Sequence, residues 1–249
     1  MHLLKDTIFK KIVKYLKQFK GLHRKNSKKL RIFMEAVYYA IRSGCQWRLL
    51  PQIYGNWRAV HKRFKAWNDR NIWKNLFELS KVEPDMELTM IDSTIVRAHA
   101  CAAGYGKNTQ KQEALGRSSG GFTTKLHAIV DALGNPLKFS LTSGQAHDST
   151  QAHSLTQGIK SAAMAGDKAY DYSAYIDYLN DNDCIAVIPA KKNRLTIRLY
   201  DKYLYKERHQ IECFFGKIKH FRRVFSRYEK SSQCYLSVIY FVSMLLWLK

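Results

Sequence analysis

Acidic residues are scarce in this sequence. Its 249 residues include 20 Asp and Glu against 42 Lys and Arg, which gives a formal net charge of +22 and a pI near 9.8. A chain this basic is expected to bind a polyanion, nucleic acid first and an anionic membrane surface second. A generally basic proteome would give the same balance. The hydrophobic content of 46% and aromatic content of 13% exclude a disordered chain.

Cysteines are few, odd in number and widely spaced. The five lie at positions 45, 101, 184, 213 and 234, and they form neither a CxxC motif nor a Cys/His cluster. This pattern excludes a disulfide framework and a zinc site, and it favours a reducing compartment.

The sequence also lacks a long apolar run. Its N-terminal segment has no apolar core followed by a small-residue cleavage site, so no signal peptide is expected. The run 234–249 is apolar but short, and it contains Ser237, Tyr240 and Ser243. It predicts a buried closing helix rather than a membrane span. We therefore expect a cytoplasmic, nucleoid-associated protein with no membrane partner.

Residues 1–80 hold most of the positive charge. They contain 19 Lys and Arg against four Asp and Glu, which is +15 of the total. Apolar spacing predicts helices before Gly21 and over 29–42, 56–68 and 72–80. Such helices are typical of a helix-turn-helix DNA-binding domain, here 1–82, although a basic bundle with a solvated face has the same pattern. The candidate DNA contacts are Arg58, Lys62 and Arg63.

The spacing of apolar residues changes from helix-like to strand-like after the acidic segment 81–87. Segments 88–96, 122–131, 136–144, 162–171 and 184–190 are typical of strands, and segments 148–160 and 173–182 are typical of helices. Three antiparallel strands followed by alternating helices and strands form the layout of a ribonuclease-H-like fold. We therefore predict an α/β domain over 83–249, with a mixed five-stranded sheet and helices.

The segment 205–219, YKERHQIECFFGKIK, predicts a helix with one narrow polar stripe. At about 100° per residue, Tyr205, Arg208, Glu212 and Lys219 share this stripe, and the apolar residues fall outside it. A carboxylate beside Arg and Lys suits a metal ligand next to a phosphate. It equally suits an Arg–Glu pair on a solvated helix.

Two aspartates occur where the predicted strands are otherwise apolar or made of small residues. Asp92 interrupts an apolar run, where an unpaired carboxylate is costly, and Asp167 ends a strand of small residues. In a ribonuclease-H-like layout these positions are neighbours, and a carboxylate from a later helix faces both. Three carboxylates without His or Cys favour Mg²⁺ or Mn²⁺, and two such ions about 3.5–4 Å apart can clamp a phosphoryl displacement.

The segment 205–219 matches the Y-(2)-R-(3)-E-(6)-K signature of DDE transposases of the insertion-sequence-four superfamily, on Tyr205, Arg208, Glu212 and Lys219. Further blocks resemble its insertion-sequence-five family, and they cover 90–99, 114–136, 143–152 and 166–171. Segments 43–51 and 54–64 resemble the N-terminal DNA-binding region of that family. The resemblance covers nearly the whole chain.

This resemblance implies a bacterial insertion-sequence transposase that binds the terminal inverted repeats of its element and target DNA. It implies metal-dependent cleavage and strand transfer, with two Mg²⁺ or Mn²⁺ ions on Asp92, Asp167 and Glu212. Three residues would be auxiliary catalytic residues that contact DNA or the scissile phosphate: Tyr205, Arg208 and Lys219. Because two DNA ends must be held together, at least a homodimer on DNA is expected.

Other polar residues of these segments are expected to contact phosphate or to have structural roles. Lys125 and Lys168 are candidate phosphate contacts. Asp131, Asp148 and Asp171 are expected to be a turn residue, a helix N-cap and a member of a surface ion pair. The histidines of these blocks are expected to be structural: His99, His127 and His147.

Two alternative functions share these features. A ribonuclease-H-like nuclease or resolvase would use the same carboxylates without needing a sequence-reading N-terminal domain. A catalytically silent repressor derived from a transposase would bind DNA without cutting it.

Overall fold

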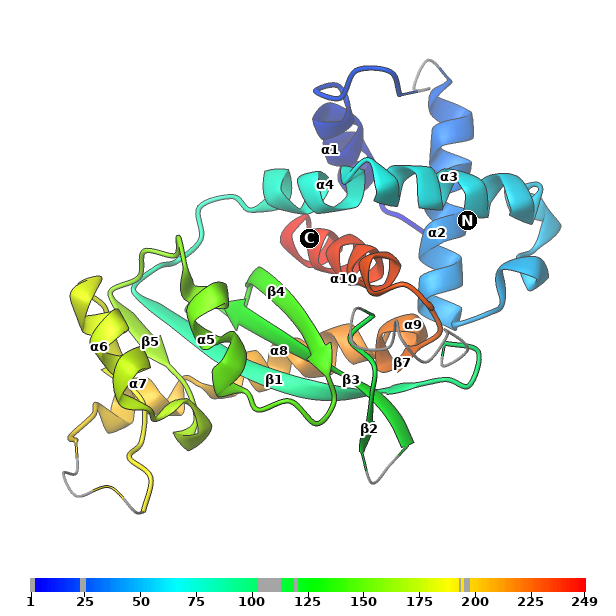
Figure 1. Cartoon of the computed structure of the whole chain (residues 1–249). Helices are drawn as coiled ribbons and strands as arrows, with labels where there is room; N and C mark the ends of the chain where they lie inside the picture. The colour runs from blue at the N-terminus through cyan, green and yellow to red at the C-terminus, as the bar shows by residue number, and fades with distance from the viewer. Residues whose placement is uncertain (1–2, 23–25, 103–112, 119–120, 193, 195–197) are drawn as a thin grey trace. The chain divides into compact units, whose positions relative to one another are not determined.

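The chain passes between two units of structure, after Val82 and again after Lys217. In the computed structural model one unit comprises Met1–Val82 and Ile218–Lys249, and the other comprises Glu83–Lys217 (Figure 1). The residues described are 3–22, 26–102, 113–118, 121–192, 194 and 198–249. Residues 218–249 cluster with the N-terminal helices, so a division into domains of 1–82 and 83–249 stays a prediction.

The first unit is helical among its described residues. Asn26 and Asn56 set the starts of two helices, because their side-chain oxygens accept the N–H groups of Lys29 and Arg58, each at 2.9 Å. The elements are α1 (Asp6–Leu16), α2 (Ser27–Ser43), η1 (Trp47–Leu49), η2 (Gln52–Tyr54), α3 (Trp57–Asp69), α4 (Ile72–Ser80), α9 (Arg222–Phe225) and α10 (Ser232–Trp247), with a two-residue strand β7 (Ser226–Arg227). The predicted helices 29–42, 56–68 and 72–80 are confirmed to within two residues.

Trp73 of α4 lies at the centre of this unit's core. Its indole nitrogen donates to the Phe64 carbonyl at 3.1 Å, and its ring meets the Phe241 ring of α10 edge-on at 5.5 Å. Much of α10 is buried, and the hydroxyl of its Ser237 bonds to Asn68 of α3 at 2.8 Å. The prediction of a buried closing helix is confirmed, and no described helix is long and apolar enough to cross a membrane.

The second unit is built on a mixed sheet. Its strands are β1 (Leu88–Ala98), β2 (Gly116–Ser118), β3 (Gly121–Val130), β4 (Pro136–Ser143), β5 (Ala163–Ala165) and β6 (Ile185–Val187). They follow the order β4-β3-β1-β5-β6, and β2 pairs with the start of β3. β3 is antiparallel to β1 and β4, whereas β5 is parallel to β1 and β6. The predicted mixed α/β class is confirmed, although β5 and β6 are shorter than expected.

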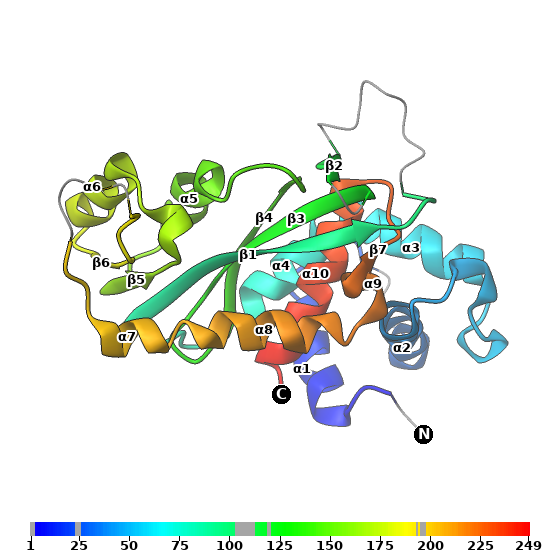
Figure 2. The ribbon, with the colours of Figure 1, turned by 90° about the horizontal axis from the view of Figure 1, so that it is seen from below.

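Helices cover both faces of this sheet. They are α5 (Ser149–Thr156), η3 (Lys168–Tyr170), α6 (Ser173–Asp181), α7 (Lys202–Lys206) and α8 (His209–Lys219). In β4 the Phe139 ring stacks on Phe214 of α8 at 5.9 Å, while the next residue, Ser140, bonds to Gln151 of α5 at 2.6 Å. Because successive strand residues face opposite ways, α8 and α5 lie on opposite faces (Figure 2).

The single helix expected over 205–219 is wrong. Tyr205 lies in α7, Glu212 lies in α8, and Arg208 stands between the two helices. Here the N–H groups of Glu207 and Arg208 bond three residues back, to Leu204 and Tyr205, which tightens the chain into a turn. No glycine or proline marks this break in the sequence.

Phe214 holds α8 on the sheet. Its side chain is fully buried, so replacing it with alanine removes apolar contacts and leaves a cavity. We expect Phe214→Ala to lower the free energy of unfolding by about 3–5 kcal/mol in chemical denaturation. The matched control is Phe225→Ala, because Phe225 is 60% exposed, and it should cost less than about 1 kcal/mol. Equal losses in both variants would contradict this packing.

Candidate active site

The pairing of β1 with β5 brings Asp92 and Asp167 level with each other. The parallel register pairs Met90 with Ala165, so each aspartate stands two residues beyond the same paired position. Asp167 leaves β5 there and caps η3, because its carboxylate accepts the N–H of Ala169 at 2.8 Å. Two of the three predicted metal ligands therefore lie on adjacent strands, Asp92 within β1 and Asp167 just beyond the end of β5.

The Asp92 side chain is partly buried and lies among several charged side chains. The N–H of Ser93 donates to its Oδ1 at 2.7 Å. Burial raises the pKa of Asp92 to about 6, against the lowering effects of that bond and of Arg208. The charges of Asp167 and Asp148 raise the pKa further. A positive charge at this place would favour the ionised carboxylate.

Arg208 supplies such a charge and links Asp92 to Glu212. Its Nη1 lies 2.9 Å from Asp92 Oδ2, and its Nη2 donates to Glu212 Oε1 one helical turn later. Burial lowers the pKa of Arg208, but the charges of Asp92 and Glu212 raise it overall, so the guanidinium stays charged. Glu212 itself is 56% exposed at its side chain. The structure thus joins two predicted ligands through a guanidinium that stands where a cation is expected.

Tyr205 and Lys219, the other two residues of the Y-R-E-K signature, lie in α7 and α8. The Tyr205 ring centroid lies 5.9 Å from the Arg208 guanidinium. Lys219 is the last residue of α8 and belongs to the first unit, and burial lowers the pKa of its ammonium. Their catalytic roles stay predictions.

The carboxylates form a donor set of hard oxygens, which suits Mg²⁺ or Mn²⁺. Within the described residues, however, no three His, Cys, Asp or Glu side chains are grouped closely enough to hold a metal ion. The guanidinium of Arg208 is a positive partner that Asp92 and Glu212 share. The residues fit a divalent cation in kind.

Asp148 is a further carboxylate of this region. It occupies the N-cap position of α5, as expected, but its side chain makes no capping bond. Instead its Oδ1 accepts the Ser93 hydroxyl at 2.6 Å and lies 3.1 Å from the Lys125 ammonium. Lys125 also donates to the Ala146 carbonyl at 2.6 Å, so protein groups already engage this candidate phosphate contact. Lys168 is exposed.

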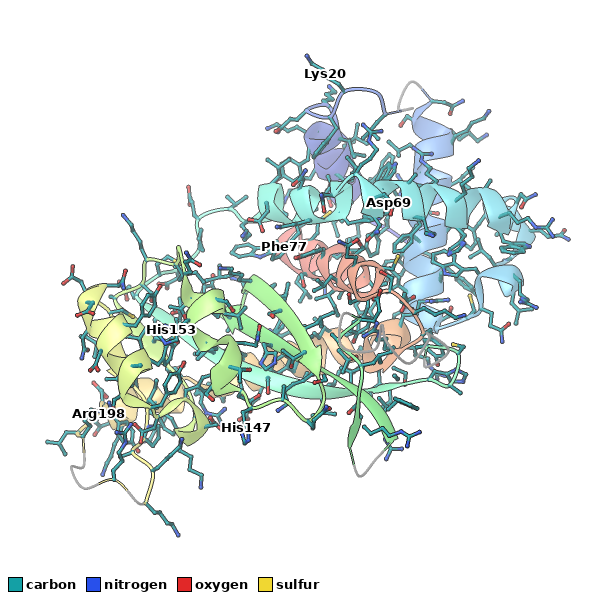
Figure 3. All side chains as sticks on the ribbon, viewed as in Figure 1. Lys20, Asp69, Phe77, His147, His153 and Arg198 are labelled. Carbon is teal, nitrogen blue, oxygen red and sulfur yellow. The ribbon has the colours of Figure 1, made fainter. Side chains whose placement is uncertain are left out.

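The two other aspartates have structural roles. Asp131 is confirmed as a turn residue, since it accepts the N–H groups of Leu133 and Asn135 at 3.1 and 2.7 Å. Asp171 was expected at the surface, but its side chain is fully buried and bonds to Arg194 and Arg198. These arginines belong to the segment before α7, where Figure 3 labels Arg198.

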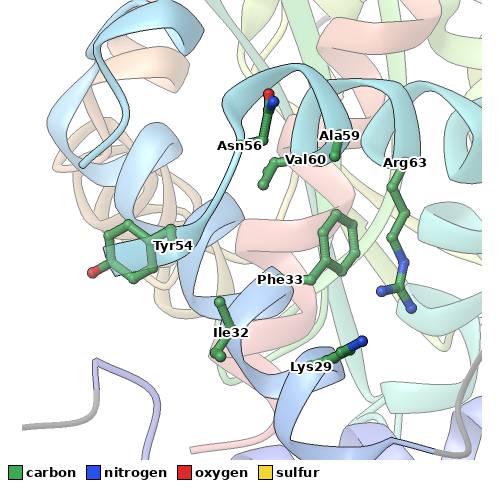
Figure 4. Close-up of a pocket in the computed structure, with 8 residues that line it drawn as sticks. All are labelled: Lys29, Ile32, Phe33, Tyr54, Asn56, Ala59, Val60 and Arg63. Carbon is green, nitrogen blue, oxygen red and sulfur yellow. The ribbon is translucent and has the colours of Figure 1, made fainter. Parts of the chain in front are cut away.

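The candidate DNA contacts of α3 lie on two different faces. Arg58 and Lys62 line a shallow cavity of about 510 Å³, together with Trp57, His61 and Lys65. Arg63 instead lines a cavity of about 490 Å³ that α2 and α3 enclose (Figure 4). Its guanidinium lies 4.4 Å from the Phe33 ring centroid, and burial lowers its pKa. The structure therefore groups Arg58 with Lys62 and separates Arg63 from them.

Comparisons with known proteins identify the family. Residues 83–245 match a family model described as "Transposase DDE domain". The chain belongs to the DDE transposases. Residues 4–77 match a second model, "Putative transposase of IS4/5 family". This agrees with the family indicated by the sequence motifs, and the chain is an insertion-sequence transposase.

Two known proteins are similar to parts of this chain. A Brucella ovis protein named "Putative transposase for insertion sequence element IS6501" is 40% identical over 129 residues, which is 51% of this chain and 99% of that protein. A Sinorhizobium fredii protein named "Uncharacterized protein y4sN" is 43% identical over 74 residues, 30% of this chain and 59% of that protein. No solved structure matches this transposase significantly.

The buried Asp171 predicts a pH-dependent contribution to stability. Burial alone would raise the pKa of Asp171, but hydrogen bonds from Arg194 and from the Lys191 N–H, with the charges of Arg194 and Arg198, lower it overall. A carboxyl whose pKa is lower in the folded state stabilises the protein above the unfolded-state pKa, and this contribution is lost as the pH falls.

We therefore expect Asp171→Asn to reduce the free energy of unfolding by about 1–3 kcal/mol at pH 7, because both arginines are part-exposed. The difference from wild type should shrink below about pH 4. Chemical denaturation across this pH range measures both effects. A constant difference between pH 7 and pH 3 would contradict the ionic role of Asp171.

Proposed function

We propose that this transposase binds the terminal inverted repeats of its own element, cuts DNA there and joins the ends to target DNA. Asp92, Asp167 and Glu212 would hold the catalytic divalent cations, two Mg²⁺ or Mn²⁺ ions. The observation that carries this proposal is the Arg208 guanidinium bonded to both Asp92 and Glu212, beside an Asp167 level with Asp92. A ribonuclease-H-like catalytic fold and a dimer on DNA belong to the same proposal.

The cation site is proposed from charge and donor chemistry. Bound divalent ions would activate the attacking oxygen and stabilise the leaving oxygen of a phosphoryl displacement. Asp92 is the rigid member of the set, since it projects from a central strand and its Oδ1 is fixed by the Ser93 N–H. Glu212 is the adjustable member, because it is largely exposed and comes from a helix.

Arg208 would neutralise and orient charged groups at this site. It pairs with Asp92 and Glu212. Its guanidinium would also offset the charge of a scissile phosphate held beside it, since arginine binds phosphate oxygens in a two-pronged geometry. Tyr205, which lies beside Arg208, would limit the directions in which the guanidinium turns.

DNA binding is proposed for the exposed basic face of α3. Arg58, Lys62 and Lys65 gather there with Trp57 and His61 around one shallow cavity. Cationic side chains on one helical face suit backbone phosphates, and the release of counterions makes such binding salt-dependent. Arg63 is the weaker candidate because its guanidinium lies over the Phe33 and Trp67 rings.

A catalytically silent repressor is the second candidate. The gathering of Arg58, Lys62 and Lys65 on one face of α3 would serve a repressor equally well, since binding DNA needs no cation site. A supercoiled plasmid carrying the flanking DNA of the element separates the two functions. Mg²⁺-dependent cuts at the repeat ends support the transposase, binding without cuts supports the repressor, and cuts elsewhere would indicate a nuclease.

Removing the charge of Glu212 should stop cleavage without stopping DNA binding. We expect Glu212→Gln to lower the cleavage rate more than about 100-fold, because a neutral amide is a poor ligand for a divalent cation. Affinity for the inverted repeats, measured by gel shift, should stay within about threefold of wild type. The matched control is Glu207→Gln, an exposed glutamate between α7 and α8. Cleavage by Glu212→Gln at the wild-type rate would disprove the assignment of this ligand.

Lys62 should contribute one phosphate contact. We expect Lys62→Gln to weaken binding to repeat and unrelated DNA about equally, and to reduce the slope of log affinity against log salt by about 1. Fluorescence anisotropy over a salt series measures both. Lys74→Gln, an exposed lysine of α4, is the control with the same charge change. If both variants change the slope equally, the α3 face is not the binding surface.

A further inference from the structure

Two large apolar side chains are exposed on the segment that joins α2 to α3 in the first unit (Figure 1). Leu49 ends η1 and is 66% exposed, and Ile53 lies in η2 and is 79% exposed. Between them Leu50 is buried, which fixes the segment to the core of the unit. Large exposed apolar side chains close together in the chain, with polar residues around them, are typical of a surface that binds another molecule.

In η1 an inward aromatic ring turns Leu49 outward. Trp47 packs against the rings of His61 and Phe64 in α3, with centroid distances of 5.2 and 5.4 Å. Successive residues of a 3₁₀ helix point about 120° apart. The direction of Trp47 therefore leaves Arg48 and Leu49 facing solvent.

The second turn, η2, has the same construction. The Tyr54 ring packs against the Tyr39 ring of α2, with their centroids 5.4 Å apart. The Tyr54 N–H donates to the Pro51 carbonyl at 3.0 Å and closes the turn, so Ile53, the residue before Tyr54, faces solvent. Both aliphatic side chains are thus presented by turns that aromatic packing holds in place.

The chain around these turns carries positive charge. From 36 to 68 the sequence contains six Lys and Arg and no Asp or Glu. Arg48 lies within η1 and Arg58 lies in the first turn of α3, and both are exposed. Glu35 of α2 is buried and bonds to Arg31 at 3.1 Å, so its charge is already balanced. A surface that combines cations with aliphatic side chains fits DNA, which offers phosphates at its edge and apolar base faces inside.

We propose that Leu49 and Ile53 form an apolar wedge that enters the minor groove of the terminal repeat and inserts at a base step, with Arg48 and Arg58 on the flanking phosphates. Aliphatic wedges of this kind partly unstack base pairs and kink the duplex, which brings more protein surface onto the DNA. This inference rests on the proposed function, because it adds a second contact to the proposed DNA-binding face of α3. A second copy of the chain is the less favoured partner, since its net charge of +22 would oppose approach to a basic surface.

The first test measures the Kd of the full chain for a double-stranded oligonucleotide of the terminal inverted repeat, by fluorescence anisotropy over a salt series. We expect the double variant Leu49→Ser/Ile53→Ser to raise this Kd about 10-fold, because the inserted apolar contact is lost. The slope of log affinity against log salt should stay unchanged, since no charge is removed. The melting temperature should also stay at the wild-type value, because both side chains are exposed.

The second test finds the inserted step. Single abasic sites are placed in turn along the oligonucleotide, and the Kd is measured for each. An abasic site at the wedge step lowers the cost of unstacking, so we expect it to tighten binding of the wild type about 10-fold and to leave binding of the double variant unchanged. The fluorescence of 2-aminopurine beside that step should rise when the wild type binds, because unstacking relieves quenching, and should not rise with the double variant.

Two control variants separate insertion from general effects. Leu133→Ser/Ile185→Ser removes two aliphatic side chains of the other unit, each 64% exposed, and should leave the Kd and the abasic-site profile unchanged. Leu49→Met/Ile53→Met keeps two large apolar side chains and should bind and unstack DNA as the wild type does.

The outcomes distinguish this inference from the proposed function. A wild-type Kd in the double serine variant and a flat abasic-site profile, with cleavage at the repeat ends by the wild type, would overturn the inference and leave the function intact. Loss of self-association by that variant in sedimentation, with the wild-type DNA profile retained, would overturn the inference and assign the surface to a second copy of the chain. A wild type that binds no repeat DNA would overturn both.

Discussion

Repulsion between carboxylates is the constraint on which the catalytic unit depends. The pairing of β1 with β5 places Asp92 and Asp167 at the same level, and the charge of Asp167 raises the pKa of Asp92. Arg208 relieves this repulsion and at the same time ties Asp92 of the sheet to Glu212 of α8. The sheet and α8 are therefore joined at this site by an arginine, a residue suited to binding phosphate.

The position of Arg208 is determined by contacts on both sides of it in the chain. Before it, Asp171 anchors Arg194 and Arg198, and Asp201 caps α7 by accepting two backbone N–H groups. After it, Phe214 fixes α8 against Phe139 of the sheet. Asp171 thus anchors residues that precede α7, and α7 leads directly into the turn that holds Arg208.

Much of this site could be predicted from sequence, because its main residues carry local signals. Asp92 interrupts an apolar strand, Asp167 ends one, and the Arg208–Glu212 spacing puts two charges on adjacent helical turns. The contact of Asp148 with Ser93 gave no such signal, because the two residues lie 55 positions apart in the chain. The break between α7 and α8 was equally hidden, since no glycine or proline produces it.

The packing of α10 has a consequence for synthesis of the protein. Residues 1–82 leave the ribosome first, but Trp73 and Asn68 find their partners Phe241 and Ser237 only when the last helix has emerged. Until then the apolar sides of α3 and α4 stay uncovered, although the basic face of α3 is already present. A nascent or truncated chain that has these lysines but lacks α10 would expose apolar surface and be prone to aggregate. The first unit to begin synthesis is thereby the last to complete its core.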